Sequence, residues 1–426
     1  MNQPDPVDSR CEETDLMERC VARENMLKAW KRVKKNGGSP GVDGMTIEET
    51  ETYLKINWPR IREELLKGSY QPKPVRKVEI EKSGGGMRQL GIPTATDRLV
   101  QQCILQILQP MWDPTFHLNS YGFRPGKSAH QAVCQAQKYV QEGRRYVADV
   151  DLEKFFDRVN HDILMDRVMK RVKDGRLVKL IRRYLQAGIM EQGAVSARDE
   201  GTPQGGPLSP LLSNLLLDEV DWELEKRGLA FARYADDCNV YVKSKRAAER
   251  AMQTMEKIMG KLKLKINREK SAAGSVLKRK FLGYSLWDAP GRQVKRRVAP
   301  QALQKFKEMV RDLTSRTCGR SMKQVIEKLD QYLVGWKGYF HLADTPNAFS
   351  ELDSWIRRRL RMIYLKQWKK MSTCRRELIA RGLSPKASST IARLRSCYWK
   401  MAGSSWVSYA LPNAHFDELG LTRLGS

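Results

Sequence analysis

The chain has 426 residues, with 77 Lys and Arg against 49 Asp and Glu and a formal net charge of +28. Its apolar fraction of 41% excludes a disordered chain, because disorder needs low hydrophobicity as well as unbalanced charge. No uncharged apolar run approaches the ~18 residues of a membrane-spanning helix, and Met1 to Arg10 lack a signal-peptide pattern. We therefore expect a cytoplasmic protein without a membrane partner, whose main partner is a polyanion, nucleic acid first.

The first part of the chain is predicted to be mostly helical, with one pair of strands. Residues 1–20 are polar and weakly patterned, and we expect them to form a leader that runs into the first helix. Apolar spacing and Gly/Pro breaks predict, in chain order, a helix at 16–35, a helix after Met45, strands at 75–80 and 88–92 around a glycine turn, and a helix at 97–108.

The middle of the chain mixes strands and helices. Its predicted elements are a buried strand at 146–152, helices up to about 187, a helix that follows the Gly/Pro-dense stretch 201–210 and runs through 225, a hairpin over 231–242, a helix at 247–262 and a strand at 281–287. We therefore expect a mixed α/β body that ends near 290–300.

The last third of the chain is predicted to be helical and strongly basic. Beyond Arg292 the strand signals vanish, and helices are predicted at 303–313, 322–336, 349–364 and 390–398. Residues 291–426 carry 27 basic and 10 acidic side chains, a net charge of +17, and half of the ten tryptophans. A solvated basic face needs no tryptophans, so we expect a folded nucleic-acid-binding region here.

Two acidic pairs are the strongest chemical signal in the chain. Asp236 and Asp237 sit at the centre of the predicted hairpin, where adjacent carboxylates repel each other unless a cation is near. Asp149 and Asp151 lie on a predicted strand, and side chains two residues apart on a strand share one face. If the two strands pair, these oxygens suit one or two Mg²⁺ ions, which prefer such ligands and keep positions for substrate phosphates.

These acids lie in a series of ordered motifs that resembles the reverse transcriptases encoded by group II introns. The motifs are, in order, PGVDG (40–44), QLGIP (89–93), YGFRPG (121–126), DLEKFF (151–156), GTPQGGPLSP (201–210), YADD (234–237), NREKS (267–271) and FLGY (281–284). The resemblance extends from about residue 20 to the end of the chain.

The resemblance implies an α+β fold with the right-hand architecture of polymerases. Fingers, a palm with an antiparallel sheet and flanking helices, and a helical thumb would be followed by a small helical C-terminal region. The implied boundaries are a leader at 1–20, an N-terminal extension and fingers at 21–145, a palm with some fingers elements at 146–290, a helical thumb or maturase region at 291–374, and a DNA-binding region at 375–426.

The resemblance also assigns the acidic residues. Asp151, Asp236 and Asp237 match the family's catalytic carboxylates, which hold two Mg²⁺ ions. Asp151 is preferred to Asp149 because the family's catalytic Asp lies five residues before an aromatic residue, here Phe156. Phe156 matches the ring that excludes a 2′-OH from the incoming nucleotide, and the alternative is an ordinary core phenylalanine.

Further residues match positions that contact the incoming dNTP. Lys82 and Arg88 flank the glycine turn, as cations gripping a triphosphate would, and Gln204 precedes the glycine pair that lets backbone approach the nascent base pair. Lys270 resembles the lysine beside the departing pyrophosphate. For the three cations, the alternative is a solvated surface position.

The basic third resembles the region that binds the parent intron RNA and the template–primer duplex. In the 351–364 helix, an apolar stripe leaves most arginines on other faces, where they can meet phosphates. The expected nucleic-acid contacts are Arg357, Arg358, Arg361, Lys366, Lys369 and Lys370.

The sequence therefore predicts an RNA-dependent DNA polymerase and splicing maturase that acts in a group II intron ribonucleoprotein. The expected partners are the intron RNA, an RNA template–DNA primer duplex, target DNA and dNTPs, and target-primed cDNA synthesis would carry out retrohoming at the nucleoid. The chain stops without the nuclease module of many relatives, so we expect the compact, class C-like form. Two alternatives stay open: a maturase with a vestigial polymerase, and a domesticated polymerase without an intron. The oligomeric state is not predicted.

Overall fold

The computed structural model of the chain describes residues 15–425 apart from 82–86, 192–193, 197–199, 203, 318 and 394–396. The chain divides into two compact units, which we call the first unit (1–275) and the second unit (276–426). The first unit mixes helices with antiparallel sheet and the second is mainly helical, which confirms the predicted α+β class. The division falls earlier than the predicted 290–300, because the small sheet after residue 279 belongs with the helices that follow it.

The N-terminal helices of the first unit pack around one long central helix. They are α1 (Leu16–Val21), α2 (Arg23–Asn36), α3 (Ile47–Leu66) and the central α4 (Ala95–Trp112). The prediction of one helix over 16–35 is wrong, because Ala22 has extended backbone angles and separates α1 from α2. Leu16 and Met17 are fully buried, so the end of the predicted leader is part of the core.

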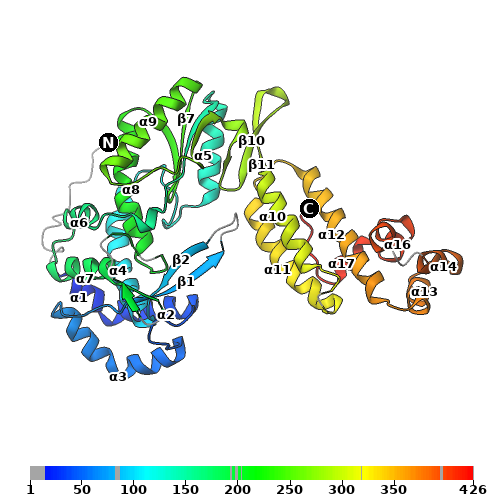
Figure 1. Cartoon of the computed structure of the whole chain (residues 1–426), viewed down its shortest axis with the longest axis horizontal. Helices are drawn as coiled ribbons and strands as arrows, with labels where there is room; N and C mark the ends of the chain where they lie inside the picture. The colour runs from blue at the N-terminus through cyan, green and yellow to red at the C-terminus, as the bar shows by residue number, and fades with distance from the viewer. Residues whose placement is uncertain are drawn as a thin grey trace, which may run out of the picture. The chain divides into compact units, whose positions relative to one another are not determined.

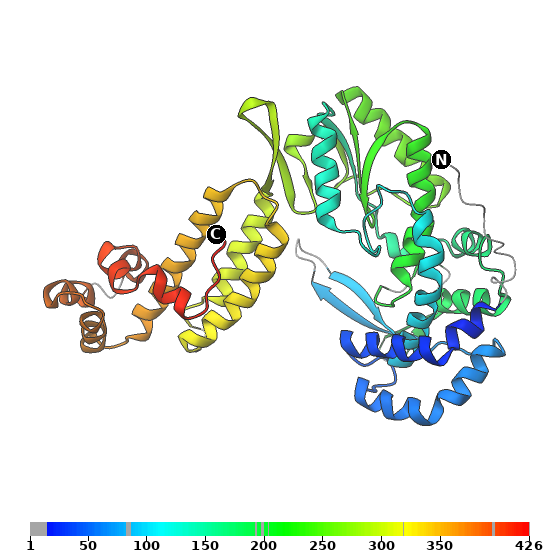
Figure 2. The same ribbon diagram turned by 180° about the vertical axis from the view of Figure 1, so that it is seen from behind.

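An outer sheet has the strand order β2-β1-β4-β5. Its β1–β2 hairpin is the pair of blue strands in Figure 2. Its strands are β1 (Val75–Glu81), β2 (Met87–Ile92), β4 (Ile189–Glu191) and β5 (Ala194–Ser196). The β1–β2 pair is the predicted hairpin, and its antiparallel register runs from Arg76 opposite Ile92 to Glu81 opposite Met87. The short strands β4 and β5 were not predicted, since three residues are too few to show a period.

A central antiparallel sheet with the order β6-β7-β3-β8 forms the middle of the first unit (Figure 1). Its strands are β3 (Tyr146–Val150), β6 (Ala230–Tyr234), β7 (Asp237–Val242) and β8 (Ala272–Ser275), and the predicted hairpin over 231–242 is thus confirmed. The helices that complete the unit are α5 (Ala129–Gln141), α6 (His161–Met169), α7 (Gly175–Gln186), α8 (Ser209–Lys226) and α9 (Lys245–Lys261), of which α5, α8 and α9 contact the central sheet. Short 3-10 turns lie at Asp113–Thr115 and Phe155–Asp157.

The second unit begins with a small sheet of order β11-β10-β9 and continues with helices. The strands are β9 (Lys280–Phe281), β10 (Tyr284–Ala289) and β11 (Gln293–Val298), with 3-10 turns at Val276–Lys278 and Pro290–Arg292. Strand β11 contradicts the prediction that strands end at Arg292: its sequence, QVKRRV, has few apolar residues, and its pairing with β10 decides its conformation.

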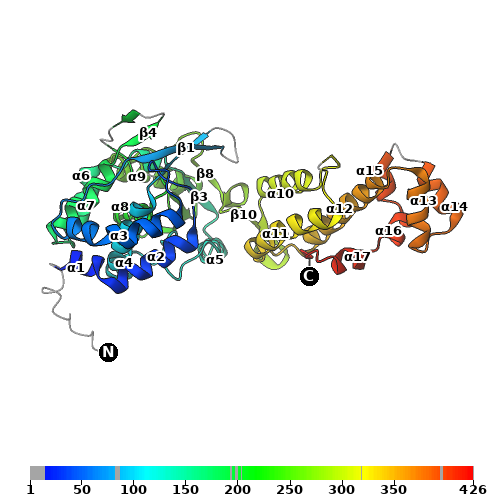
Figure 3. The ribbon, with the colours of Figure 1, turned by 90° about the horizontal axis from the view of Figure 1, so that it is seen from below.

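The helices of the second unit are laid out along the chain in Figure 3. They are α10 (Pro300–Leu313), α11 (Met322–Phe340), α12 (Pro346–Gln367), α13 (Met371–Ala380), α14 (Pro385–Arg393), α15 (Tyr398–Ala402), α16 (Ser405–Ala410) and α17 (Asn413–Glu418). The predicted helix at 390–398 overlaps the end of α14 and the start of α15, and its residues 394–396 lie outside the described part of the chain. Trp336 contacts Phe306, Phe340 and Phe349, so this tryptophan joins α10, α11 and α12 in one core.

Candidate active site and basic surface

The central sheet brings the predicted catalytic carboxylates to one end of two adjacent strands. Strands β3 and β7 pair antiparallel, and their last pair is Val150 opposite Cys238. Asp151 is the next residue after β3, and Asp237 is the first residue of β7, so the two occupy adjacent places at the edge of the ladder. Asp236 lies beside them in the turn between β6 and β7.

That turn is a two-residue loop in a strained conformation. Tyr234 pairs with Asp237, which leaves Ala235 and Asp236 as the loop, and Ala235 has φ of 58°. A positive φ at the first loop position is typical of the turns that match strand twist, but for a residue with a Cβ it costs about 1–2 kcal/mol. The surrounding structure therefore has to hold this turn in place.

Gly122 is one part of that support. The segment 119–121 lies beside β6, since Arg233 donates its backbone N–H to Asn119 and accepts from Tyr121. The next residue, Gly122, meets the turn so closely that a Cβ there would lie 2.2 Å from the amide nitrogen of Ala235. Only glycine permits this approach.

The side chain of Arg233 is the other part. It is 1% exposed and forms a bidentate pair with the fully buried Asp221, at 2.8 and 2.5 Å. It also donates to the carbonyl of Ala235 at 2.9 Å and to Asn214, which in turn donates to the carbonyl of Gly122 at 2.8 Å. Burial opposes the charge, but Asp221 outweighs it and raises the pKa of Arg233. The sequence reasoning missed this network, although an arginine in a strand beside the YADD motif is a visible signal.

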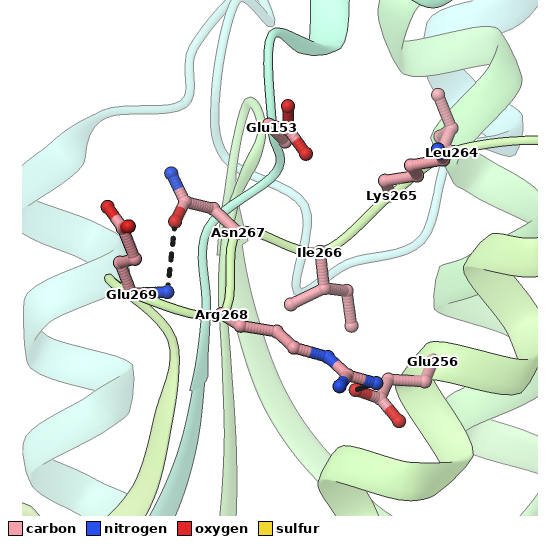
Figure 4. A pocket seen from close by; sticks show the side chains of 8 residues that line it. All are labelled: Glu153, Glu256, Leu264, Lys265, Ile266, Asn267, Arg268 and Glu269. Atoms are coloured by element: carbon pink, nitrogen blue, oxygen red, sulfur yellow. Dashed lines mark hydrogen bonds and ion pairs between the residues drawn. The ribbon is translucent and has the colours of Figure 1, made fainter.

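The loop that carries Asp151 is held from the other side by the segment 265–271. Ser271 accepts from the Asp151 amide at 2.9 Å and donates to its carbonyl, and Asn267 donates its amide to the same carbonyl at 2.9 Å. The Asn267 side chain accepts from the amides of Glu269 and Lys270, and Figure 4 shows the first of these bonds. The predicted Lys270 is therefore exposed on a fixed turn that adjoins the Asp151 backbone.

A pocket of about 710 Å³ adjoins this turn (Figure 4). Glu153, Glu256 and Glu269 line it together with Lys265 and Arg268, and Arg268 pairs with Glu256 at 3.4 Å. The walls of this pocket therefore carry both signs of charge, next to the segment that holds the Asp151 backbone.

A second pocket, of about 610 Å³, brings Phe156 and Gln204 together. Phe156 is 9% exposed and packs edge-on against Phe155, so it both lines the pocket and joins the core. The carbonyl of Gln204 accepts from Gly91 of β2 at 2.9 Å, and a Cβ at Gly205 would lie 2.7 Å from the Gly91 carbonyl. The glycine after Gln204 thus lets strand β2 of the outer sheet approach this loop.

Arg98 and Gln102 also line this second pocket, and the sequence reasoning did not select them. Arg98 donates to the carbonyls of Gly37 and Ser39, and Gln102 is 6% exposed with a side-chain nitrogen that has no partner among the described residues. Arg98 and Gln102 lie one helical turn apart on α4. This spacing predicts that they share a face of the helix, but not that this face lines a pocket.

The two predicted triphosphate contacts are described only in part. Lys82 lies outside the described residues. Arg88 belongs to β2, where its backbone pairs with Ile80, and its side chain lies outside the described part.

The carboxylates of Asp151, Asp236 and Asp237 are chemically suited to bind a hard cation. Among the described residues, no three His, Cys, Asp or Glu side chains are gathered closely enough to hold a metal ion. The register nevertheless puts Asp151 and Asp237 in adjacent places with Asp236 in the connecting turn, and carboxylate oxygens are the ligands that Mg²⁺ prefers.

In the second unit, the predicted exposure of two arginines on α12 is wrong. Arg357 is 2% exposed and pairs with Asp353 and Asp417, and Arg361 is 8% exposed and donates to the carbonyl of Leu411 and to Asn413. The C-terminal residues 411–418 cover this face of α12, so these guanidinium groups do not face solvent.

The remaining predicted contacts are more accessible. Arg358 is half-buried, lies 4.2 Å from the ring centroid of Trp399 and donates to the Trp399 carbonyl. Lys366, Lys369 and Lys370 are exposed around the end of α12. These four cations remain candidates for phosphate contacts.

Two family models match this chain. Residues 80–286 match the family model described as "Reverse transcriptase (RNA-dependent DNA polymerase)", and residues 303–381 match "Group II intron, maturase-specific domain". None of the helices in the described part of the chain combines the length and the hydropathy needed to cross a bilayer.

Two curated relatives illustrate the extent of the similarity. Protein YkfC of Escherichia coli (strain K12) is 36% identical over 276 residues, which are 56% of this chain and 72% of the relative. The group II intron-encoded protein LtrA of Lactococcus lactis subsp. cremoris is 35% identical over 194 residues, which are 45% of this chain and 32% of LtrA. The match thus spans most of the first relative and about a third of the second.

Proposed function

Because the chain belongs to the family of group II intron-encoded reverse transcriptases, we propose that it copies RNA into DNA and assists the splicing of a group II intron RNA. In a ribonucleoprotein with that RNA it would act in retrohoming, by cDNA synthesis primed at a DNA target in the nucleoid. The proposal of polymerase activity rests on the strand register, in which Asp151 follows the last residue of β3 and Asp237 begins the neighbouring β7.

The proposed metal ligands are Asp151, Asp236 and Asp237, which would hold two Mg²⁺ ions. When bound, such ions stabilise the charge on the attacking and leaving oxygens of a phosphoryl transfer. The protein's own contribution is positional. Gly122 and the Arg233 network hold the turn of Asp236, and Ser271 holds the backbone of Asp151.

The proposed nucleotide contacts surround these carboxylates. Phe156 would pack under the deoxyribose and exclude a 2′-OH, and Gln204 would contact the nucleotide from the same pocket. Lys270 would meet the departing pyrophosphate from its turn next to Asp151. Lys82 and Arg88 would bind the triphosphate by charge.

The proposed nucleic-acid contacts of the second unit are Arg358, Lys366, Lys369 and Lys370. They would meet the intron RNA and the template–primer duplex, and residues 375–426 would approach target DNA. Arg357 and Arg361 are left out of this set because both are buried in ion pairs or hydrogen bonds. We also propose fingers at 21–145, a palm at 146–290 and a helical thumb at 291–374, so that the small sheet of β9, β10 and β11 spans the boundary between palm and thumb.

Primer extension on an RNA template tests the proposal. Asp236→Ala should lower the rate by at least about a hundred-fold, because a cation ligand is lost where charge develops. Asp149→Asn is the matched control: it removes a neighbouring acid of β3 that we do not assign to the metal, and the loss should be much smaller. Full extension by Asp236→Ala would refute the metal assignment, and equal losses would favour Asp149 as a ligand.

A further inference from the structure

The second unit contains a pocket that none of the predicted contacts accounts for. It has a volume of about 320 Å³ and is lined by Arg311, Ser315, Arg316, Arg359, Met362 and Trp399. Three guanidinium groups thus converge from the end of α10, the loop after it and α12 on one small concave space.

Arg359 is the lining residue that hydrogen bonds hold in place. Its Nε donates to the hydroxyl of the buried Thr314 at 2.6 Å, and its terminal nitrogen donates to the carbonyls of Arg311 and Thr314 at the end of α10. The guanidinium also lies 5.4 Å from the ring centroid of Trp355, whose ring Arg311 approaches at 5.8 Å. Such fixed cations pay little further ordering entropy when they bind a ligand.

The positive charge of the pocket is not neutralised by ion pairs within the described residues. None of Arg311, Arg316 and Arg359 has a carboxylate at ion-pair distance there, and Asp312 is the acid that acts on Arg359 from nearby. Burial, and then the neighbouring Arg311 and Arg316, lower the pKa of Arg359. An anion in the pocket would relieve this repulsion.

Trp399 adds an aromatic wall. Trp399 is 39% exposed, and the Arg358 guanidinium lies over its ring at 4.2 Å from the centroid, so the ring is held by one cation while the residue lines the pocket. A nucleotide whose base has left its stack offers both matching groups: a phosphate for the arginines and an exposed planar base for the tryptophan. Folded RNA presents such bases in loops and bulges, whereas duplex DNA does not.

We propose that this pocket binds one unstacked nucleotide of a folded RNA, with its phosphate on Arg311, Arg316 and Arg359 and its base on Trp399. The inference rests on the proposed role of the second unit in RNA binding, and it names a site for that role. Five of the six lining residues lie within the stretch that matches the maturase-specific domain.

The test measures binding of the full-length chain to a labelled RNA hairpin with an unpaired oligoadenosine loop, over a range of salt concentrations. Arg311 and Arg316 are exposed, so Arg311→Ala and Arg316→Ala should fold. Each should weaken binding about 3- to 10-fold and make the slope of log affinity against log salt shallower by about 1. Trp399→Ala should weaken binding about 10-fold, and Trp399→Phe should restore most of it.

Lys305→Ala is the matched control, because Lys305 is also an exposed cation of α10 but does not line the pocket. An equal effect of Lys305→Ala would overturn the site in favour of general charge attraction. Equal losses with a loop-free RNA duplex would overturn the stacked base, and equal losses with a DNA hairpin would overturn the choice of RNA.

The binding assay contains EDTA and no dNTPs, so it does not depend on polymerase activity. Primer extension by the wild-type chain is measured separately. If extension fails while the hairpin results hold, the proposed polymerase function is refuted and the pocket stands. If extension succeeds while the arginine variants bind normally, the pocket is refuted and the polymerase stands.

Discussion

Buried arginines stabilise both units, but they hold different kinds of structure. In the first unit, Arg233 fastens a two-residue turn that would otherwise relax from its positive φ. In the second unit, Arg357 joins α12 to α17 through Asp417, and no strained backbone is involved. The comparison shows that one residue type can hold a strained turn beside a proposed metal site in one place and close a helical core in another.

The largest expected effect comes from the Arg233 pair. Arg233→Met leaves Asp221 charged and fully buried, so it should destabilise the first unit by about 3–5 kcal/mol. Arg182→Met, which breaks an exposed pair with Asp162, should cost less than about 1 kcal/mol. Because a chain of two units need not unfold in one step, hydrogen exchange at the amides of β6 and β7 is the local measurement. Similar costs for both variants would contradict the assigned role of Arg233.

The next effect separates a buried cation from an exposed one within the second unit. Arg357→Ala should cost about 2–3 kcal/mol of stability, because Asp417 loses a charged partner, and should leave the salt dependence of RNA binding unchanged. Lys369→Ala should do the opposite, with little loss of stability and a salt slope shallower by about 1. Hydrogen exchange at the amides of α12 and α17, together with RNA titration of both variants, decides this. A shallower slope for Arg357→Ala would mean that the residue meets phosphate after all.

Phe156 tests whether a side chain can serve both core and site. Phe156→Ala should raise the incorporation of ribonucleotides relative to deoxyribonucleotides about 10-fold, because the ring would no longer exclude the 2′-OH. Phe155→Leu is the control, since Phe155 packs against the same ring but does not line the pocket. Single-nucleotide extension with both sugars measures the ratio. An unchanged ratio would leave Phe156 as a core residue only.

The smallest effect concerns the strain at Ala235. Ala235→Gly should leave stability unchanged or raise it by up to about 1 kcal/mol, because glycine adopts a positive φ without penalty. The same change should lower the rate of primer extension several-fold, since the turn of Asp236 becomes freer to move. Thermal unfolding and steady-state rates are the two measurements. A rate that rises with stability would show that the strain serves no catalytic purpose.

The sequence predicts a region well when its conformation depends on residues that are close together in the chain. The β6–β7 hairpin needs only a two-residue turn between alternating strands, so Asp236 and Asp237 could be placed from sequence, and the pairing with β3 then puts Asp151 beside them. The faces of α12 depend on residues 411–418, about fifty positions later in the chain. The helical spacing of apolar residues in α12 predicts one buried face. It contains no information about a distant segment that buries a second face. Arg357 and Arg361 were therefore misplaced.

The bonds between Asp151 and Ser271 have a consequence for the order in which the protein is made. The ribosome must synthesise residue 271 before the loop of Asp151 has its support, so the acidic site forms late in the emergence of the first unit. Residues 276–426 are still to come at that point. At about 5–20 residues per second, their translation takes roughly 8–30 seconds, which is long compared with the folding of a domain. A nascent chain thus has time to form the sheet that carries Asp151 and Asp237 before the proposed RNA-binding helices of the second unit have been made.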